Sequence, residues 1–258
     1  MLLTQTQSAR MISRIPEEID AVSQIQLAKP LRPDILTVGE ERTPVVIIDD
    51  VLDSLESMAE LAAGEDFTYD HRFSYPGQRT RLPPEYASVV LPELQRLIAE
   101  IYSPPESTDF QLVHEFYSLI TLRPEELVHL QRVPHFDTLL PWYFATVHFL
   151  NPGTYAGTGL FRHRPTGFER ISEARYPAFV EAAQAHVSTH GWPEAGYIKE
   201  SDEHFEMIAE LEYKPNRLVL YPGNLLHSGL IEPDRDISAD PVKGRLTANL
   251  FLNYVVPS

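Results

Sequence analysis

The second half of the chain is a succession of short apolar or alternating runs, and this pattern constrains the fold more than any other feature. The runs occupy residues 110–122, 143–150, 158–162, 208–213, 217–221 and 245–256. Turn-forming sequences separate them, such as Asn151-Pro152-Gly153. Many short strands divided by such turns are typical of a sandwich or barrel. The pattern therefore predicts a mainly β protein.

Helices are expected on the N-terminal side of this β region. Residues 52–63 and 92–102 carry apolar side chains at helical spacing, and Pro92 suits the first position of the second helix. Residues 43–50 form a β-branched run that is typical of a buried strand. Residues 1–42 are polar with scattered prolines, and we expect a peripheral arm.

The succession of strands is interrupted between about residues 168 and 206, where the first part has helical composition and the end is mostly polar. The chain has 258 residues and 43% hydrophobic content, which is enough for one core. We therefore expect a single domain over residues 43–258, with the inserted segment as a lid.

Composition excludes several classes of function. The net charge of −16 disfavours nucleic acid and anionic membranes as partners, which leaves a small molecule. The absence of cysteine excludes disulfides, thiolate metal sites and cysteine nucleophiles, so any metal is held by His, Asp or Glu. We find no signal peptide and no apolar run of about 20 residues, and we expect a cytoplasmic protein. The oligomeric state stays open, with a homodimer as one option.

Three residues have the pattern of a metal site. His135 and Asp137 are two positions apart, so on a strand their side chains share a face. His227 follows an apolar run and a tight turn, and it can supply a third ligand. Two histidines and one carboxylate on one face are the ligand set of non-haem Fe(II) oxygenases, which keep the other positions open. An isolated pair such as His135 and Asp137 is a weak signal, and the distal histidine strengthens it.

A basic residue follows this pattern at the start of the next apolar run. Arg245 and Thr247 share a strand face, and a guanidinium there can bind a carboxylate through two hydrogen bonds, to which the threonine adds a hydroxyl. A surface ion pair is the alternative role for Arg245.

The order of these motifs resembles the Fe(II)/2-oxoglutarate-dependent oxygenase superfamily, in particular its prolyl-hydroxylase-like branch and uncharacterised bacterial relatives. Residues 45–61 resemble that branch's opening strand and helix, residues 156–161 its glycine-rich strand, and residues 217–222 the strand before its distal histidine. The likeness covers about residues 43–256. It implies a double-stranded β-helix, or jelly roll, with flanking helices.

The resemblance also implies the cofactors and their ligands. His135, Asp137 and His227 would bind Fe(II), Arg245 would hold the distal carboxylate of the co-substrate 2-oxoglutarate, and O2 would be the oxidant. Thr247 and Tyr143 are assigned to the same co-substrate pocket. The sequence departs from the branch in two ways. An arginine stands where lysine is usual, and it lies further from the distal histidine, after an acidic loop in which Arg235 is a rival anchor.

The resemblance implies hydrogen abstraction from a substrate, followed by hydroxylation, desaturation or oxidative ring closure such as cyclopropane formation. Asp137 argues against halogenation, because the halogenases of the superfamily have a small residue there. The arginines suggest a small amino-acid-like substrate, in specialised-metabolite biosynthesis; a peptide or a protein-bound residue is the alternative within this enzyme class. A cupin-like metal-binding module or isomerase without 2-oxoglutarate is the alternative function.

Several polar and aromatic residues are candidates for the substrate pocket. We assign substrate binding to Arg162, Arg164, His163, Glu115 and Tyr117, with the two arginines as ligands of a substrate carboxylate. Four more candidates have an equally ordinary role as loop charges or core residues: Arg79, Arg81, Trp142 and His148. We expect the inserted segment and the strand around Glu115 to border the open face of the metal site. An external helical brace is the alternative role for the insertion.

Overall fold

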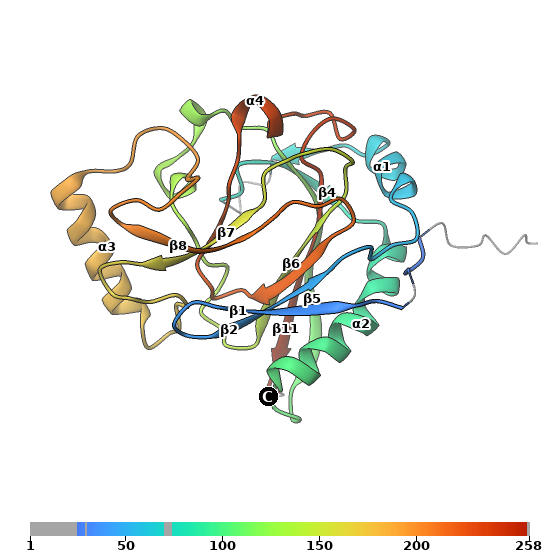
Figure 1. Cartoon of the computed structure of the whole chain (residues 1–258), viewed down its shortest axis with the longest axis horizontal. Helices are drawn as coiled ribbons and strands as arrows, with labels where there is room; N and C mark the ends of the chain where they lie inside the picture. Colours follow the sequence, from blue (N-terminus) through green and yellow to red (C-terminus); the bar gives the residue numbers. More distant parts are fainter. Residues whose placement is uncertain (1–24, 29, 70–73, 257–258) are drawn as a thin grey trace, which may run out of the picture.

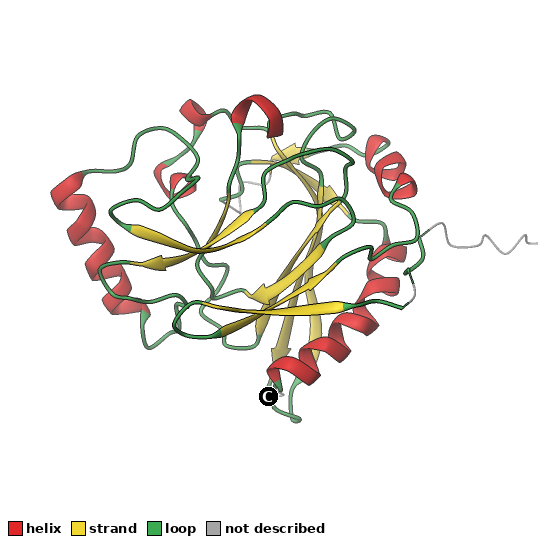
Figure 2. Ribbon diagram, viewed as in Figure 1, coloured by secondary structure: helices red, strands yellow, loops and turns green. Residues whose placement is uncertain are grey.

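The predicted strands form two antiparallel sheets in a computed structural model that describes residues 25–28, 30–69 and 74–256 (Figures 1 and 2). The large sheet has eight strands in the order β1-β2-β9-β6-β11-β5-β4-β3. In that order the strands are Pro33–Val38, Thr43–Ile48, Leu218–Pro222, Tyr143–Phe149, Thr247–Val255, Asp109–Ile120, Gly77–Arg81 and Thr68–Tyr69. The small sheet has three strands in the order β10-β7-β8, namely His227–Gly229, Thr158–His163 and Phe205–Leu211.

The chain passes repeatedly from one sheet to the other. Strands β5, β6, β9 and β11 are neighbours in the large sheet, whereas β7, β8 and β10 form the small one. An antiparallel bridge between His135 and His227 extends the small sheet by one more segment. In each sheet, strands that are distant in sequence lie side by side, such as β9 beside β6 and β10 beside β7, which is the topology of a double-stranded β-helix. The predicted jelly roll is confirmed.

Helices cover the outer face of the large sheet. Helices α1 (Glu56–Ala63) and α2 (Pro84–Tyr102) contribute Met58, Leu94 and Ile98 to one apolar cluster, together with the outward-facing residues of β9, β6 and β11. This alternation leaves the other face of the same strands to the interior of the barrel. A second cluster there joins residues of the large sheet, including Val219 and Tyr221, to Leu160 of β7.

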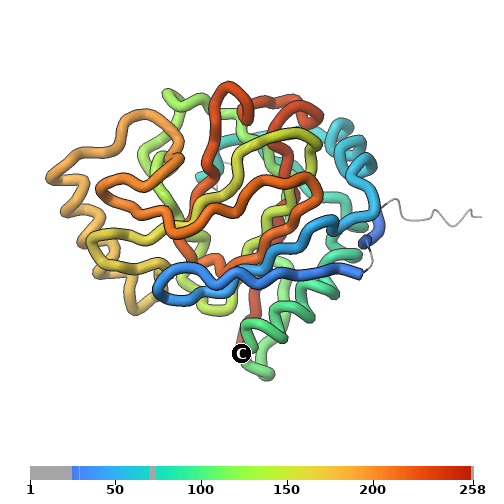
Figure 3. The backbone as a smooth tube through the Cα atoms, viewed as in Figure 1, coloured from blue at the N-terminus to red at the C-terminus, as the bar shows by residue number. Residues whose placement is uncertain are grey.

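The inserted segment packs against the other side of the small sheet. Helix α3 (Tyr176–His190) lies beside β7 and β8, at the left in Figures 1 and 3. Its Phe179 and the neighbouring Phe168 pack against the third apolar cluster, which contains Phe161 and Phe205. Helix α4 (Pro233–Asp236) and two 3-10 turns (Pro124–Glu126 and His129–Arg132) complete the described helices. None of these helices combines the length and the apolar character that crossing a bilayer requires.

The N-terminal elements differ from the sequence prediction in two places. Residues 33–38, predicted as part of a peripheral arm, form β1 and pair along their length with β2; residues 1–24 of that arm lie outside the described residues. Helix α2 begins at Pro84, so Pro92 lies inside it and not at its start. The helix continues through Pro92 because residues on both sides of it, such as Tyr86 and Leu94, bury their side chains against the sheet.

Candidate active site

The backbone holds the three predicted metal ligands together at one end of the small sheet. The N–H groups of His135 and His227 each donate to the other's carbonyl oxygen, at 2.9 and 2.8 Å. The Asp137 N–H donates to the Gly223 carbonyl at 2.7 Å, next to the turn that Leu225 N–H closes onto Pro222 O at 3.0 Å. These bonds fix the two ligand segments relative to each other before any ion is bound. One ligand atom from each of the three residues lies within 4.8 Å of the others.

The hydrogen bonding of His227 leaves the correct ring nitrogen for a metal. Its Nδ1 lies 2.8 Å from the Leu225 carbonyl oxygen. A carbonyl only accepts, so Nδ1 carries the proton and Nε2 keeps its lone pair. That Nε2 lies 3.9 Å from Asp137 Oδ1. A backbone carbonyl that orients a histidine in this way is a common support for a metal ligand.

The electrostatics of the site also suit a cation. His135 keeps part of its surface open to solvent, but the protein atoms around its ring lower its pKa well below the usual value. His227 and Arg79 lower that pKa further, so the imidazole is neutral and able to coordinate. Burial raises the pKa of Asp137, against the opposing effect of His227 and Arg79. A divalent ion would supply the positive charge that this carboxylate lacks. The donor set of two imidazoles and one carboxylate fits iron(II).

Gly223 lets the aromatic wall approach Asp137. A Cβ at this position would lie 2.7 Å from Cδ1 of Tyr143 and 3.4 Å from Oδ2 of Asp137. Burial raises the pKa of Tyr143, and the Asp137 charge adds to that shift, whereas Arg79 opposes it. Tyr143, predicted in the co-substrate pocket, is thus placed beside the metal carboxylate.

Arg245 lies in the interior of the barrel, and only part of its guanidinium group makes hydrogen bonds to the protein. The residue is 5% exposed. Its Nε donates to the Ala156 carbonyl at 2.7 Å and its Nη2 to the Gly157 carbonyl at 3.2 Å. No described residue accepts a hydrogen bond from Nη1. The two carbonyls therefore fix the orientation of the group and leave its outer edge for a carboxylate.

Tyr221 is a buried residue that interacts electrostatically with both Arg245 and the metal ligand Asp137. Burial raises the pKa of its phenol well above the usual value, the Asp137 charge raises it further, and Arg245 opposes the shift. Its ring is 4.9 Å from that of His227, measured between centroids. The buried Tyr221 side chain is thus within electrostatic reach of both Asp137, the proposed iron ligand, and Arg245, the proposed anchor of 2-oxoglutarate.

Two hydroxyl groups near Arg245 are buried without a hydrogen-bond partner among the described residues. They belong to Tyr75 and Ser118. Burial raises the pKa of Tyr75, whereas Arg79, Arg245 and the Ser118 hydroxyl lower it; the two hydroxyls lie close enough to influence each other but do not meet hydrogen-bond geometry. An unsatisfied buried donor costs about 1–3 kcal/mol, so the pair indicates a place for an acceptor. A carboxylate beside Arg245 would satisfy both.

Thr247 lies in the same region, but its hydroxyl already donates a hydrogen bond within the protein. It donates to Asn249 Oδ1 at 2.9 Å, and Asn249 Nδ2 in turn donates to the Thr146 carbonyl at 3.1 Å. The oxygen of Thr247 can therefore accept but not donate. A direct hydrogen bond from Thr247 to a carboxylate stays a prediction that this arrangement does not favour.

The model of a protein family described as a family of unknown function, DUF6445, matches residues 29–252. The chain belongs to this family. No curated protein matches the sequence.

Several solved structures are similar in architecture at low identity. HygX from Streptomyces hygroscopicus, with nickel, 2-oxoglutarate and hygromycin B bound, is 14% identical with a TM-score of 0.46, over 83% of this chain and 84% of that chain. SnoK, a non-haem α-ketoglutarate-dependent carbocyclase from nogalamycin biosynthesis, is 11% identical with a TM-score of 0.46, over 83% and 80%. An N-substituted L-amino acid dioxygenase from Burkholderia ambifaria AMMD is 14% identical with a TM-score of 0.37, over 85% and 84%. Similarity of this size identifies neither a reaction nor a substrate.

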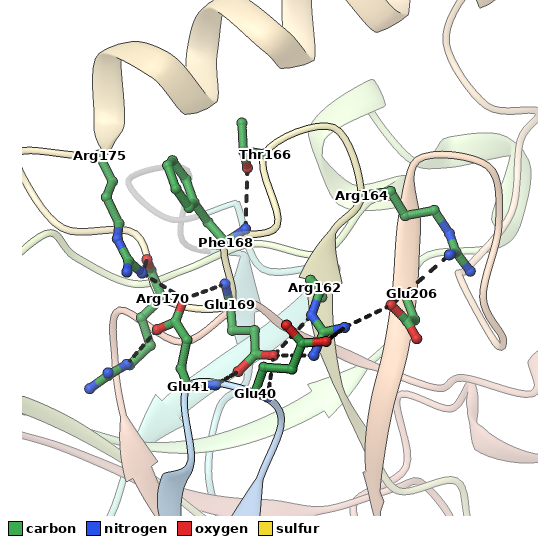
Figure 4. Close-up of polar contacts among 10 residues, drawn as sticks. All are labelled: Glu40, Glu41, Arg162, Arg164, Thr166, Phe168, Glu169, Arg170, Arg175 and Glu206. Atoms are coloured by element: carbon green, nitrogen blue, oxygen red, sulfur yellow. Dashed lines mark hydrogen bonds and ion pairs between the residues drawn. The ribbon is translucent and has the colours of Figure 1, made fainter.

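The structure places the predicted substrate arginines in a surface network of charges (Figure 4). The Arg162 guanidinium contacts Glu169 at 2.6 Å, Glu40 at 3.1 Å and Glu206 at 3.2 Å. Arg164 is half-exposed and donates to the Asp202 carbonyl at 2.8 Å. Three carboxylates thus occupy Arg162, and a substrate carboxylate would have to displace them. This placement does not favour the predicted role.

The same network ties the inserted segment to the turn between β1 and β2. The buried Glu169 carboxylate accepts from the N–H groups of Glu40 and Glu41, at 2.8 and 3.0 Å. Glu41 in turn accepts from Arg170 at 3.0 Å and from Arg175 at 2.6 Å. Burial would raise the pKa of Glu41, but its hydrogen bonds outweigh that effect and the pKa is lowered. These contacts stabilise the outside of the barrel.

The other three predicted substrate residues also have structural partners. His163 lies 2.8 Å from His204, between their Nε2 atoms, and 2.8 Å from the Thr166 hydroxyl. Tyr117 donates to the Met58 carbonyl at 2.9 Å, on the helix-covered face of the sheet. Glu115 pairs with Arg81 at 2.7 Å.

Two of the ordinary roles considered from the sequence are observed. His148 is a buried core histidine between Tyr86 and Asn216, at 3.0 and 3.1 Å. Trp142 is partly buried against the apolar cluster under helices α1 and α2. It also lines a surface groove of about 500 Å³ with Tyr102 and Arg170, and no metal ligand lines this groove.

The inserted segment contains the external brace considered from the sequence, and its role as a lid over the open face stays a prediction. Phe136, which lies between the two metal ligands in sequence, packs against Phe179 and Tyr176 of α3, at ring distances of 5.9 and 6.3 Å. The helix is therefore an external brace behind the metal site. The stretch after it runs toward the interior polar residues: Tyr197 donates to the Leu122 carbonyl at 2.7 Å, and the Tyr75 phenol adds to the rise in pKa of Tyr197 that burial begins.

Sequence reasoning left three interior residues unassigned or undervalued. Arg79, treated as a loop charge, lies on β4 opposite Ser118. Ser118 is a small polar residue among mostly apolar and aromatic residues at the end of β5, which was an available signal. Tyr75 belongs to a Tyr-Pro-Gly turn whose position relative to Arg245 no local pattern indicates.

Proposed function

We propose that the chain is an Fe(II)- and 2-oxoglutarate-dependent oxygenase that removes hydrogen from a small amino-acid-like substrate. The observation that carries this proposal is the pairing of two features within one barrel. One is a converged site of two histidines and a carboxylate. The other is a buried arginine with an open edge, whose charge influences Tyr221, the residue packed against His227. A metal module without a co-substrate, such as a cupin-like isomerase, has no need of this second feature.

Each group has a defined part in the proposed reaction. His135, Asp137 and His227 hold iron(II) on one face, and the other face stays available to ligands. Arg245 binds the distal carboxylate of 2-oxoglutarate, and the hydroxyl groups of Tyr75 and Ser118 donate to the same oxygens. When bound, iron(II) and 2-oxoglutarate supply an oxidant able to remove hydrogen from an unactivated C–H bond.

The protein's own contribution is positioning and exclusion of water. The carbonyls of Ala156 and Gly157 set the direction of Arg245, and the Leu225 carbonyl sets the tautomer of His227. Tyr143 and Tyr221 form an apolar wall beside the carboxylate ligand, which limits solvent around the oxidant. Hydroxylation, desaturation and ring closure differ only after hydrogen removal, so this site is compatible with each.

Succinate formation tests the proposal. For hydroxylation, one 2-oxoglutarate and one O2 should yield one succinate, one CO2 and one hydroxylated product. Even without substrate, we expect slow 2-oxoglutarate-dependent succinate formation above the background of free iron. Asp137→Ala should abolish it and release the iron, whereas the exposed carboxylate variant Asp109→Asn should behave like the wild type. Wild-type protein that retains iron and never converts 2-oxoglutarate would contradict the proposal.

A further inference from the structure

The surface groove beside Trp142 has an aromatic wall. It has a volume of about 500 Å³ and lies on the outer face of the large sheet, where β2 and β6 begin and β9 ends. The rings of Tyr102, Trp142 and Phe144 line it, and those of Tyr102 and Phe144 are 4.7 Å apart between centroids. The Tyr102 hydroxyl already donates to the Pro44 carbonyl at 2.8 Å. The volume falls within the range of small-molecule sites, and a mostly aromatic or apolar lining is usual for them.

Two arginines of the inserted segment give this groove a positive charge. Glu41 accepts from Arg170 Nε at 3.0 Å and from Arg175 Nη1 at 2.6 Å, so the two guanidinium groups share one carboxylate (Figure 4). Neither Nη group of Arg170 donates to a described residue, and the Arg170 side chain is 39% exposed. Among the described residues that line the groove, none is acidic. One positive charge thus remains at the groove, in a chain whose net charge is −16.

Asn224 adds an unsatisfied amide to the same groove. The residue lines the groove and is only 7% exposed. Its Oδ1 is buried and accepts no hydrogen bond, and its Nδ2 donates none, within the described part of the chain. A buried polar group left in this state costs about 1–3 kcal/mol. The Ile171 N–H donates to the Asn224 carbonyl at 2.8 Å, so Asn224 and Arg170 belong to neighbouring segments. A ligand with polar atoms can therefore meet both side chains.

We propose that this groove binds a small carboxylic acid with an aromatic or other apolar body. The free Nη groups of Arg170 bind the carboxylate, and the Asn224 amide supplies a further hydrogen bond. The apolar body of the acid lies against Trp142 and Phe144. No metal ligand lines the groove, so the acid binds in addition to any ligand in the barrel. The inference goes beyond the proposed oxygenase function and does not depend on it.

Tryptophan fluorescence tests the assignment at the groove itself. The chain has two tryptophans, and Trp192 does not line the groove. In Trp192→Phe, tryptophan emission therefore comes from Trp142 alone. The probes are benzoate, phenylacetate and 3-phenylpropanoate, each with its primary amide, added to metal-free protein. At least one acid should change the Trp142 emission with saturation and bind about tenfold or more tightly than its amide, because the amide lacks the charge. Acetate, which has no apolar body, should bind more weakly than that acid.

Three variants locate the bound acid. Arg170→Gln should abolish the preference for the acid over its amide. Arg164→Gln is the matched control and should keep it, because Arg164 is a half-exposed arginine of the same network that does not line the groove. Arg245→Gln should keep it too, since Arg245 lies inside the barrel. Melting curves show that each variant is folded. Acids that bind no better than amides, or a preference that survives Arg170→Gln, would overturn the proposal, and a preference lost in Arg245→Gln would place the acids in the barrel.

Dilution tests whether a second copy of the chain occupies the groove instead. Without added acid, the Trp142 emission of Trp192→Phe should be proportional to protein concentration, with no shift in wavelength. A wavelength shift that follows a change in molar mass, measured by light scattering, would assign the groove to self-association and overturn the proposal.

Discussion

Replacing Arg245 with glutamine should sharply weaken the binding of 2-oxoglutarate. The arginine is 5% exposed, and its Nε and Nη2 groups already donate to the carbonyls of Ala156 and Gly157. The remaining edge is the part that would meet a carboxylate. Truncating one partner of a buried charged pair costs about 2–5 kcal/mol. Because each 1.4 kcal/mol is about tenfold in affinity, the Kd should rise roughly thirtyfold to several thousandfold.

Isothermal titration of 2-oxoglutarate into Ni(II)-loaded protein measures this change. Arg235→Gln is the control, because Arg235 is the rival anchor in sequence but pairs with Asp236 at 3.0 Å and has a side chain that is 42% exposed; its Kd should change by less than about threefold. Tyr75→Phe removes one hydroxyl donor and should cost about 0.5–1.5 kcal/mol, or two- to tenfold. The reasoning is refuted if folded Arg245→Gln, checked by its melting curve, binds 2-oxoglutarate as the wild type does.

Three further predictions concern stability and the geometry of the ligands. Burial lowers the pKa of three histidines to about 4: His148, His163 and His204. The unfolded chain therefore binds more protons than the folded one between pH 6.5 and about 4. The free energy of unfolding, measured in urea, should fall as the pH decreases through this window, and it should fall less steeply in His148→Gln. A free energy of unfolding that does not change with pH would contradict this. Gly223→Ala should displace Tyr143, whose ring packs beside Asp137, at a cost of about 1–3 kcal/mol. The shifted ring should weaken iron retention in equilibrium dialysis, and iron binding equal to the wild type would contradict this. Arg162→Gln should leave the buried Glu169 carboxylate without its cation and lower the free energy of unfolding by about 3 kcal/mol. The Kd for 2-oxoglutarate should not change. A large rise in that Kd would show that Arg162 contributes to the active site.

The sequence predicts the barrel strands well because their periodicity reports burial directly. The runs around β5, β6, β9 and β11 alternate or are continuously apolar, and each lies within a few residues of its predicted position. Strand β4, with the sequence Gly-Gln-Arg-Thr-Arg, has no such pattern. Its place depends on pairing with β5, about 40 residues away, and local propensity contains no information about that pairing.

The metal ligands were predictable for a related reason. A histidine and a carboxylate two positions apart share a face in any extended segment, and the turn before His227 limits where the chain can return. The substrate residues were not predictable in this way. One partner of Arg162, Glu40, is more than 100 residues distant in sequence, and no local rule separates an arginine that meets a ligand from one that meets a glutamate. Arg79 and Tyr75 gain their interest only from their spatial relation to Arg245 and Asp137.

The central claim is that one iron(II) and one 2-oxoglutarate meet at His135, Asp137 and His227. The most direct test is anaerobic: Fe(II) is added to the metal-free protein, 2-oxoglutarate follows, and the visible absorption spectrum is recorded. We predict a weak metal-to-ligand charge-transfer band that saturates at one iron and one 2-oxoglutarate per chain. It should be absent from Asp137→Ala and unchanged in Asp109→Asn. Wild-type protein that binds iron without this band, or an Asp137→Ala variant that keeps it, would contradict the account.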